Sequence, residues 1–154
     1  MAARKAGPAG KPARSVNAAF DVVALASSAG GLNALNEILS ALPADFPAAV
    51  LVVQHLDPRH RSLMAEILSR HTPLLVKQAE EGDMIEPGTV YIARPDRHLL
   101  ANADRTLSLT QSELVHFVRP SADLLFESVA ASYKQRSIAV VLTGSGSDGA
   151  MGIS

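Results

Sequence analysis

Apolar residues are concentrated in three nearly unbroken segments of the chain, at residues 20–25, 48–53 and 137–143. Val, Leu, Ile and Ala dominate these segments, and polar or glycine-rich residues follow each of them. Apolar runs of this length are typical of strands buried on both faces of a parallel sheet. We therefore expect three central strands at these positions.

Between these segments, apolar residues recur at helical spacing. The first such pattern has Leu or Ile at positions 32, 35, 38, 39 and 42, and it predicts a helix that ends before Pro43. Residues 61–71 predict a second helix with one apolar side. Residues 121–135 predict a third, amphipathic helix, for which Ser121 is a suitable N-cap.

The middle of the chain shows only partial alternation of apolar and polar residues, over residues 74–80, 88–94, 98–104 and 106–112. Turn-forming residues separate these segments, which predicts short strands, some of them antiparallel and paired as hairpins. Strands that alternate with helices predict a parallel sheet with right-handed crossovers. The expected fold is therefore α/β: a doubly wound, mostly parallel sheet with helices on both faces and an antiparallel hairpin region in the middle.

The composition is that of one globular domain. The chain has 154 residues, of which 47% are apolar, 19% charged and 4% aromatic, which suffices for a single hydrophobic core. Residues 1–18 are rich in Ala, Gly and Pro and are predicted to be a disordered basic tail, so that the domain comprises residues 19–154. The absence of cysteine excludes disulfides, thiol catalysis and thiolate metal sites.

Charge and hydropathy narrow the possible partners. Four of the 14 basic residues lie in residues 1–19, which hold no acid, so the rest of the chain carries ten basic and 15 acidic side chains. This balance, without a basic stripe, does not predict nucleic-acid binding. No apolar run approaches the roughly 20 residues that span a bilayer. The basic N-terminal residues followed by AAFDVVALASS imitate a signal peptide. However, Asp21 interrupts the apolar region that a signal peptide requires, and the segment also fits a strand. We therefore expect a cytoplasmic protein.

Polar residues that can carry chemistry follow all three predicted central strands. Ligands of doubly wound sheets bind at the carboxyl ends of the strands, near a reversal of strand order. The residues expected there are Ser27 and Ser28 after the first strand, Gln54, His55 and Asp57 after the second, and Thr143, Ser145, Ser147 and Asp148 after the third. A serine, a histidine and an aspartate should thus converge on one crevice.

The sequence ASSAG, residues 26–30, approximates the G-x-S-x-G nucleophile elbow. In such a strand-to-helix turn a serine hydroxyl is exposed beside free helix N-terminal amides, which can stabilise an oxyanion. Ser28 lies at the centre of the pattern, two residues before Gly30, whereas Ser27 is expected to point into the strand end. The alternative interpretation is that the serine only caps the following helix.

Three roles are open for His55, which directly follows VLVVQ. It can be the general base of a Ser-His-Asp triad. It can also be a structural histidine held by hydrogen bonds, or a metal ligand together with Asp57 and His60. The metal-site interpretation has no support from an i, i+4 histidine pair. In addition, Pro58 breaks any helix that could place these residues on one face.

Asp148 lies in the sequence TGSGSDGAMG, for which two interpretations are open. In a triad, the aspartate fixes the tautomer and orientation of the histidine. Gly144, Gly146 and Gly149 also form a G-x-G-x-x-G pattern, which in a dinucleotide-binding protein precedes a complete helix and an acidic residue about 20 positions on. The given sequence contains neither.

Five segments resemble, in order, the motif series of the CheB-type protein-glutamate methylesterase domain: SSAGGLNAL, VVQHLDP, PDRHL, VRPSADLLFESVA and VLTGSGSDGAMG. The likeness runs from about Asp21 to the last residue. It implies a serine hydrolase that demethylates glutamyl methyl esters of chemoreceptors with release of methanol, and that also deamidates certain receptor glutamines. It implies no metal and no organic cofactor. Methylated chemoreceptors would be the partners, and the protein would be peripheral to the membrane only through them.

The resemblance also implies roles for single residues. By position in the motifs, Ser28 is the nucleophile, His55 the base and Asp148 the orienting acid. His98, in PDRHL, matches a histidine that borders the site of the family, and we expect a supporting role for it. The segment VRPSADLLFESVA is expected to be architectural, with its helix packed on the sheet.

Several features depart from the family pattern. Ala24 and Ala26 replace the usual glycines, and a Cβ at Ala26 would add strain if φ there were positive. Ser145 stands where the family often has methionine near the oxyanion site. The family continues for some tens of residues beyond Asp148, and its standard members carry a receiver domain before the esterase. We therefore expect this chain to lack both of these parts.

Two other function classes follow from these departures and from the glycine pattern. One is a CheB-like module that binds receptors or signalling partners without catalysis. The other is a nucleotide-binding domain. The receptor served, the mode of regulation and the oligomeric state do not follow from the sequence.

Overall fold

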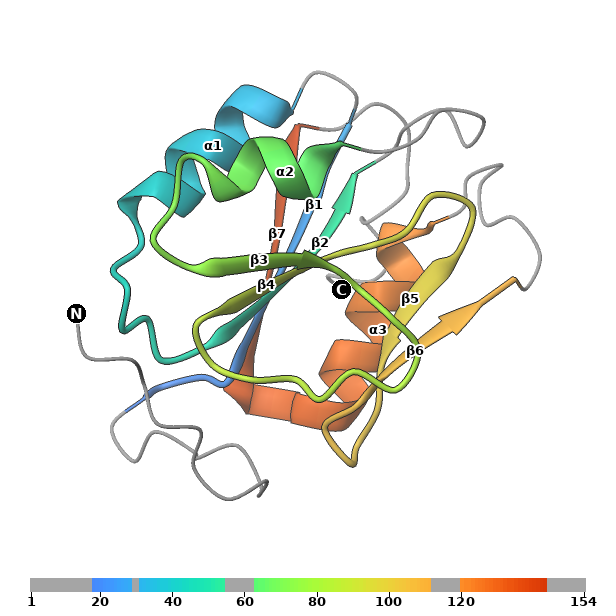
Figure 1. Ribbon diagram of the computed structural model, residues 1–154. Coiled ribbons are helices and arrows are strands. Elements are labelled where there is room, and N and C mark those ends of the chain that lie inside the picture. Colours follow the sequence, from blue (N-terminus) through green and yellow to red (C-terminus); the bar gives the residue numbers. More distant parts are fainter. Residues whose placement is uncertain (1–17, 29–30, 55–62, 112–119, 144–154) are drawn as a thin grey trace.

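A computed structural model of the chain describes residues 18–28, 31–54, 63–111 and 120–143. Five strands form one parallel sheet in the order β3-β4-β2-β1-β7 (Figure 1). Their bounds are Val22–Ser27 for β1, Ala49–Gln54 for β2, Leu75–Gln78 for β3, Thr89–Ile92 for β4 and Ser137–Thr143 for β7. The three predicted apolar segments are thus β1, β2 and β7, which lie side by side.

A separate two-stranded antiparallel sheet consists of β5 (His98–Ala101) and β6 (Leu107–Thr110). It is the predicted antiparallel hairpin region. The other two middle segments, predicted at residues 74–80 and 88–94, are the parallel strands β3 and β4 of the main sheet. Burial explains this difference, because all four residues of β4 are buried, as expected for a strand inside a sheet with both faces covered.

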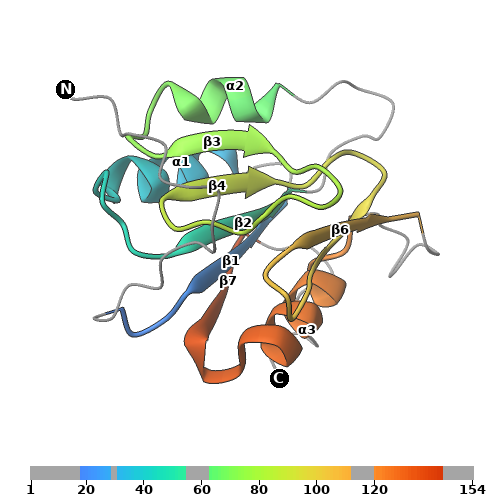
Figure 2. The ribbon, with the colours of Figure 1, turned by 60° about the horizontal axis from the view of Figure 1, so that its bottom comes forward.

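Helices cover both faces of the main sheet, as predicted (Figures 1 and 2). On one face, α1 (Leu32–Ala41) and α2 (Met64–Ser69) contribute Leu35, Leu39, Met64 and Leu68 to the core. On the other face, α3 (Ala122–Tyr133) and the β5–β6 hairpin form a second core, in which Phe126 is the largest fully buried side chain. Ser121 is the N-cap of α3, as predicted, and its hydroxyl accepts a hydrogen bond from the Leu124 N–H.

The interior strand β1 carries the two alanines, Ala24 and Ala26, at the positions where glycines were expected. Ala24 and Ala26 are 0% and 3% exposed and pack in the core against α3. Neither has a positive φ; among the described non-glycine residues only Asp96, Arg105 and Lys134 do. The condition for strain at Ala26 is therefore not met, because the residue lies in a strand without a positive φ and its Cβ packs in the core.

Before β1, an ion pair ties the two ends of the described domain together. β1 begins two residues later than predicted, because Asp21 lies outside the strand and accepts two hydrogen bonds from Arg136, at 2.8 and 3.0 Å. Arg136 ends a short 3₁₀ helix, Lys134–Arg136, that leads into β7. The hydrogen bonds to Asp21 raise the pKa of Arg136.

Of the described helices, none has the length and hydropathy that crossing a membrane requires.

Candidate active site

The carboxyl ends of three strands meet at one edge of the sheet. β1 lies between β2 and β7, and strand order reverses there, because α1 leads from β1 to β2 on one side whereas α3 leads to β7 on the other. Ser27 is in register with Gln54 of β2 and with Thr143 of β7. The carboxyl ends of these three strands are therefore direct neighbours. This edge is where doubly wound proteins bind their ligands.

Ser28 begins the turn from β1 to α1. Its carbonyl oxygen accepts a hydrogen bond from the Gly31 N–H at 2.9 Å, and α1 begins at Leu32. Ser28 is half-buried, whereas Ser27 is 2% exposed and still belongs to the strand. The N-cap of α1 is Gly31, so the interpretation of Ser28 as the cap of this helix is wrong. The strand, the tight turn and the helix fit the predicted nucleophile elbow.

The first turn of α1 supplies hydrogen-bond donors at this edge. The helix ladder starts with the bond from the Leu35 N–H to the Gly31 carbonyl oxygen, at 3.0 Å. The N–H groups of Leu32, Asn33 and Ala34 precede it and have no acceptor within the helix. Gly31 provides no side-chain cap, and the first turn of α1 contains no acidic residue. The positive end of the helix dipole can therefore act on an anion near Ser28.

Gln54 is the last residue of β2 and directly precedes His55. It is 7% exposed, and its side-chain Nε2 donates a long hydrogen bond of 3.4 Å to the carbonyl oxygen of Ser28. Gln54 was expected at this edge from its position after an apolar strand, but the sequence indicates no role for it. A polar residue at the last position of an otherwise apolar strand was the available signal.

His98 and Ser121 meet at the start of α3. His98 is 0% exposed, and its Nδ1 accepts a hydrogen bond from the Ser121 N–H at 3.0 Å. Nδ1 therefore carries no proton, and the ring proton is on Nε2. Because α3 runs back along the sheet and leads into the amino end of β7, its first turn lies toward the edge that carries Ser28. The structure thus gives His98 a contact that supports the start of a helix.

The described residues include one of the three predicted catalytic residues. Ser28 lies on the turn described above, whereas His55 and Asp148 lie outside the described residues. The possible metal ligands Asp57 and His60, Ser145 and the glycines of the G-x-G-x-x-G pattern also lie outside them. Among the described residues there is no group of three or more His, Asp or Glu that is placed to hold a metal ion.

A cavity lies at the opposite edge of the sheet, before β1. It measures about 280 Å³ and is lined by Asp21, Ala103, Arg105, Ser132 and Tyr133. Burial raises the pKa of Tyr133 above its usual value, and the nearby charge of Arg105 partly opposes this effect. The cavity contains none of the predicted catalytic residues, so we assign the candidate active site to the strand ends and not to this cavity.

Comparison with known proteins agrees with the motif series. The sequence profile of the family described as CheB methylesterase matches residues 23–154. A relative from Leptospira interrogans is 40% identical over 134 residues, which are 87% of this chain and 69% of the relative. The protein-glutamate methylesterase/protein-glutamine glutaminase 4 of Myxococcus xanthus is 46% identical over 132 residues, 86% of this chain and 37% of that protein.

A solved structure shares the fold. The crystal structure of the Thermotoga maritima CheB methylesterase catalytic domain matches with a TM-score of 0.82 and 40% sequence identity. The match covers 86% of this chain and 72% of that one.

Proposed function

The chain belongs to the CheB methylesterase family, and from this premise we propose that it is a serine hydrolase acting on glutamyl methyl esters of chemoreceptors. The observation that carries the proposal is the register at the sheet edge: Ser27, Gln54 and Thr143 are paired across three adjacent strands. In the sequence, Ser28 and His55 directly follow Ser27 and Gln54, and Asp148 lies five residues after Thr143. A serine nucleophile, a base and an acid thus start from neighbouring strand ends.

In the first half of the proposed reaction, the Ser28 Oγ attacks the carbonyl carbon of the methyl ester. His55 takes the hydroxyl proton as the new C–O bond forms. The negative charge on the carbonyl oxygen is held by N–H groups in the first turn of α1, which have no acceptor within the helix. The tetrahedral intermediate collapses, the bond to the methoxy oxygen breaks, and His55 returns the proton, so that methanol leaves.

In the second half, water hydrolyses the acyl-enzyme. His55 takes a proton from the water, and the resulting hydroxide attacks the same carbonyl carbon. The bond to the Ser28 Oγ breaks and the oxygen regains its proton from His55, which releases the glutamate side chain as a carboxylic acid. Asp148 keeps the ring of His55 in the tautomer and orientation that both halves require. No metal or organic cofactor takes part in this scheme.

The same site can act on a receptor glutamine. Attack of Ser28 on the side-chain amide forms the same acyl-enzyme and releases ammonia instead of methanol. The name of the Myxococcus xanthus relative includes a glutaminase activity, which supports this second reaction for our chain.

We also propose that residues 19–154 belong to a methylesterase domain and that the protein acts in the cytoplasm. Residues 22–27 form an interior strand of the sheet, between β2 and β7, and are almost entirely buried. Removal of these residues as the apolar region of a signal peptide would take this interior strand out of the domain. This placement in the fold supports the strand interpretation and disfavours the targeting one.

The test is methanol release from a chemoreceptor that carries methyl-labelled glutamyl esters. The wild-type chain should release labelled methanol, and the Ser28→Ala variant should lower kcat by a factor on the order of 10⁴ or more. Ser40→Ala is the matched control, because this exposed serine at the end of α1 only donates to the Glu37 carbonyl oxygen. This control should keep wild-type activity, with the fold of each variant checked by circular dichroism.

Two outcomes would contradict the proposal. Undiminished methanol release by a folded Ser28→Ala variant would show that another residue is the nucleophile. If the folded wild-type chain bound the methylated receptor but released no methanol, the chain would be a binding module of the same family.

A further inference from the structure

Two buried polar groups without partners lie side by side below the turn that carries Ser28. The Ser27 Oγ and the Gln54 Oε1 are both buried, and neither has a hydrogen-bond partner among the residues that the structure describes. Their residues are 2% and 7% exposed and face each other in register on the adjacent parallel strands β1 and β2. Unsatisfied buried polar groups are rare in proteins because each costs free energy. Their occurrence as neighbours requires an explanation.

Both residues lie on the face of the sheet that α1 covers. Side chains alternate along a strand, and Leu25 of β1 and Val50 and Val52 of β2 belong to the core on the α1 side. Ser27 and Gln54, at even spacing from these residues, share that face. The apolar core therefore ends in one polar pair, directly below the turn between β1 and α1.

The orientation of the Gln54 amide follows from its hydrogen bond. The Ser28 carbonyl oxygen can only accept, so the amide atom that faces it at 3.4 Å is the donor, Nε2. The Oε1 acceptor therefore points away from Ser28. The hydroxyl of Ser27 is a donor on the neighbouring strand, so the two unpartnered groups are complementary in chemistry.

We infer that Ser27 and Gln54 are positioning residues for the nucleophile. In this role the Ser27 hydroxyl turns to donate to the Gln54 Oε1, a bond that the structure itself does not contain. That bond would hold the Gln54 amide, whose Nε2 donates to the Ser28 carbonyl oxygen. That oxygen also accepts from the Gly31 N–H at 2.9 Å. Two donors thus fix the peptide group of Ser28 relative to the sheet and to the start of α1. The inference rests on the proposed function, because it assigns Ser28 as the nucleophile.

The consequence is geometric coupling within the site. Gln54 is held in the sheet by its pairing with Ser27 on β1 and directly precedes His55 in the sequence. Its side chain contacts the turn that carries Ser28. Gln54 therefore links the end of β2, which His55 follows, to the turn that carries the proposed nucleophile. An error of about 1 Å in the placement of reacting groups costs on the order of 100-fold in rate. Loss of this contact should therefore reduce kcat more than it changes KM.

The first test is a set of size-matched substitutions. Gln54→Met keeps the length of the side chain and removes both amide groups, so kcat for methanol release should fall by about tenfold or more with KM little changed. Ser27→Thr keeps the hydroxyl, whereas Ser27→Val has the same shape without it. We expect Ser27→Thr to retain most of the activity and Ser27→Val to lose about as much as Gln54→Met, with no further loss in the double variant.

A second readout does not depend on activity. Hydrogen exchange at the Gly31 amide reports how firmly the Ser28 carbonyl oxygen is held. Exchange should become about two- to tenfold faster in Gln54→Met and in Ser27→Val, the change expected for one net hydrogen bond, and should stay unchanged in Ser27→Thr. Asn36→Leu is the control, because it removes another buried amide oxygen without a partner, on α1 but away from the turn.

These outcomes separate the two proposals. Wild-type kcat in Gln54→Met, or equal behaviour of Ser27→Thr and Ser27→Val in both measurements, would overturn the positioning role while leaving Ser28 as the nucleophile. If the wild-type chain released no methanol, the proposed function would fail, and the exchange of the Gly31 amide would still decide whether the Ser27–Gln54 pair holds the turn.

Discussion

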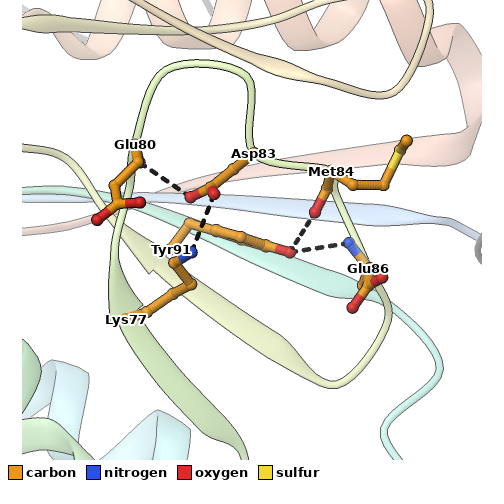
Figure 3. A network of polar contacts seen from close by, with 6 residues as sticks. All are labelled: Lys77, Glu80, Asp83, Met84, Glu86 and Tyr91. Carbon is orange, nitrogen blue, oxygen red and sulfur yellow. Dashed lines mark hydrogen bonds and ion pairs between the residues drawn. The ribbon is translucent and has the colours of Figure 1, made fainter. Parts of the chain in front are cut away.

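Tyr91 shows how one polar side chain can hold a long connection. It is 2% exposed, and its hydroxyl donates to the Met84 carbonyl oxygen at 2.6 Å and accepts from the Glu86 N–H at 3.0 Å (Figure 3). Asp83 adds a second tie, because it accepts from the Lys77 Nζ and from the Glu80 N–H, both at 2.9 Å. These bonds fix the segment between β3 and β4 against the sheet.

We expect Tyr91→Phe to destabilise the domain. The substitution leaves the Met84 carbonyl and the Glu86 N–H without the hydroxyl, so the free energy of unfolding in urea should fall by about 1–3 kcal/mol. Burial raises the pKa of Tyr91 above its usual value of 10.0. The folded state thus holds this proton more tightly than the unfolded state, so stability falls as pH rises through the raised pKa.

The pH dependence of the free energy of unfolding at alkaline pH distinguishes the wild type from Tyr91→Phe. Between pH 9 and pH 11 the free energy of unfolding of the wild type should decrease more steeply than that of Tyr91→Phe, because the variant has no such proton to lose. Equal slopes for the two proteins would show that Tyr91 does not contribute to the pH dependence.

At the scale of elements, the start of α3 is fixed by a side chain from β5. The Ser121 N–H donates to the Nδ1 of His98, which is fully buried, while the Ser121 hydroxyl caps the helix. A buried N–H group must find an acceptor, and the imidazole supplies it. This contact gives His98 a structural role at the start of α3.

The matching prediction compares two side chains of similar size. His98→Leu leaves the Ser121 N–H buried without an acceptor and should cost about 1–3 kcal/mol of unfolding free energy. His98→Asn provides an oxygen in a similar place and should cost less. Urea unfolding measures both, and kcat of methanol release is measured in parallel. A large loss of kcat without a loss of stability would assign His98 to the reaction itself.

Some elements followed from the sequence and others did not. Residues 32–42 had clear helical spacing before a proline, and the structure has α1 at Leu32–Ala41. The partial alternation in residues 74–94 was equally compatible with a hairpin. The structure instead makes β3 and β4 parallel, and Met84, in the connection between them, forms an antiparallel bridge with Thr106 beside β6. Such a contact depends on residues distant in sequence, which local patterns do not encode.

At the scale of the whole molecule, strand order creates the candidate site. β7 follows β1 by more than 100 residues in the sequence, yet pairs with it along its length, and the Asp21–Arg136 ion pair lies at the start of both strands. The sequence predicted that a serine, a histidine and an aspartate would follow three buried strands. It could not predict that β1 would lie between the other two, because strand order results from packing of the helices on both faces.

The polar pair below the turn could not be predicted either. Ser27 had been assigned to the strand end, where the structure places it, but its register with Gln54 is a property of the assembled sheet. A pattern in one segment cannot show which side chain faces it from another strand.

Ser28, and not the adjacent Ser27, is the proposed nucleophile of this serine hydrolase. The most direct measurement is the site of covalent labelling by a fluorophosphonate, which reacts with activated serines, read out by peptide fragmentation that distinguishes the two residues. We predict one adduct, on Ser28, and none on the folded Ser28→Ala variant. An adduct on Ser27 or at another serine, or a folded wild-type chain that takes up no label, would contradict the claim.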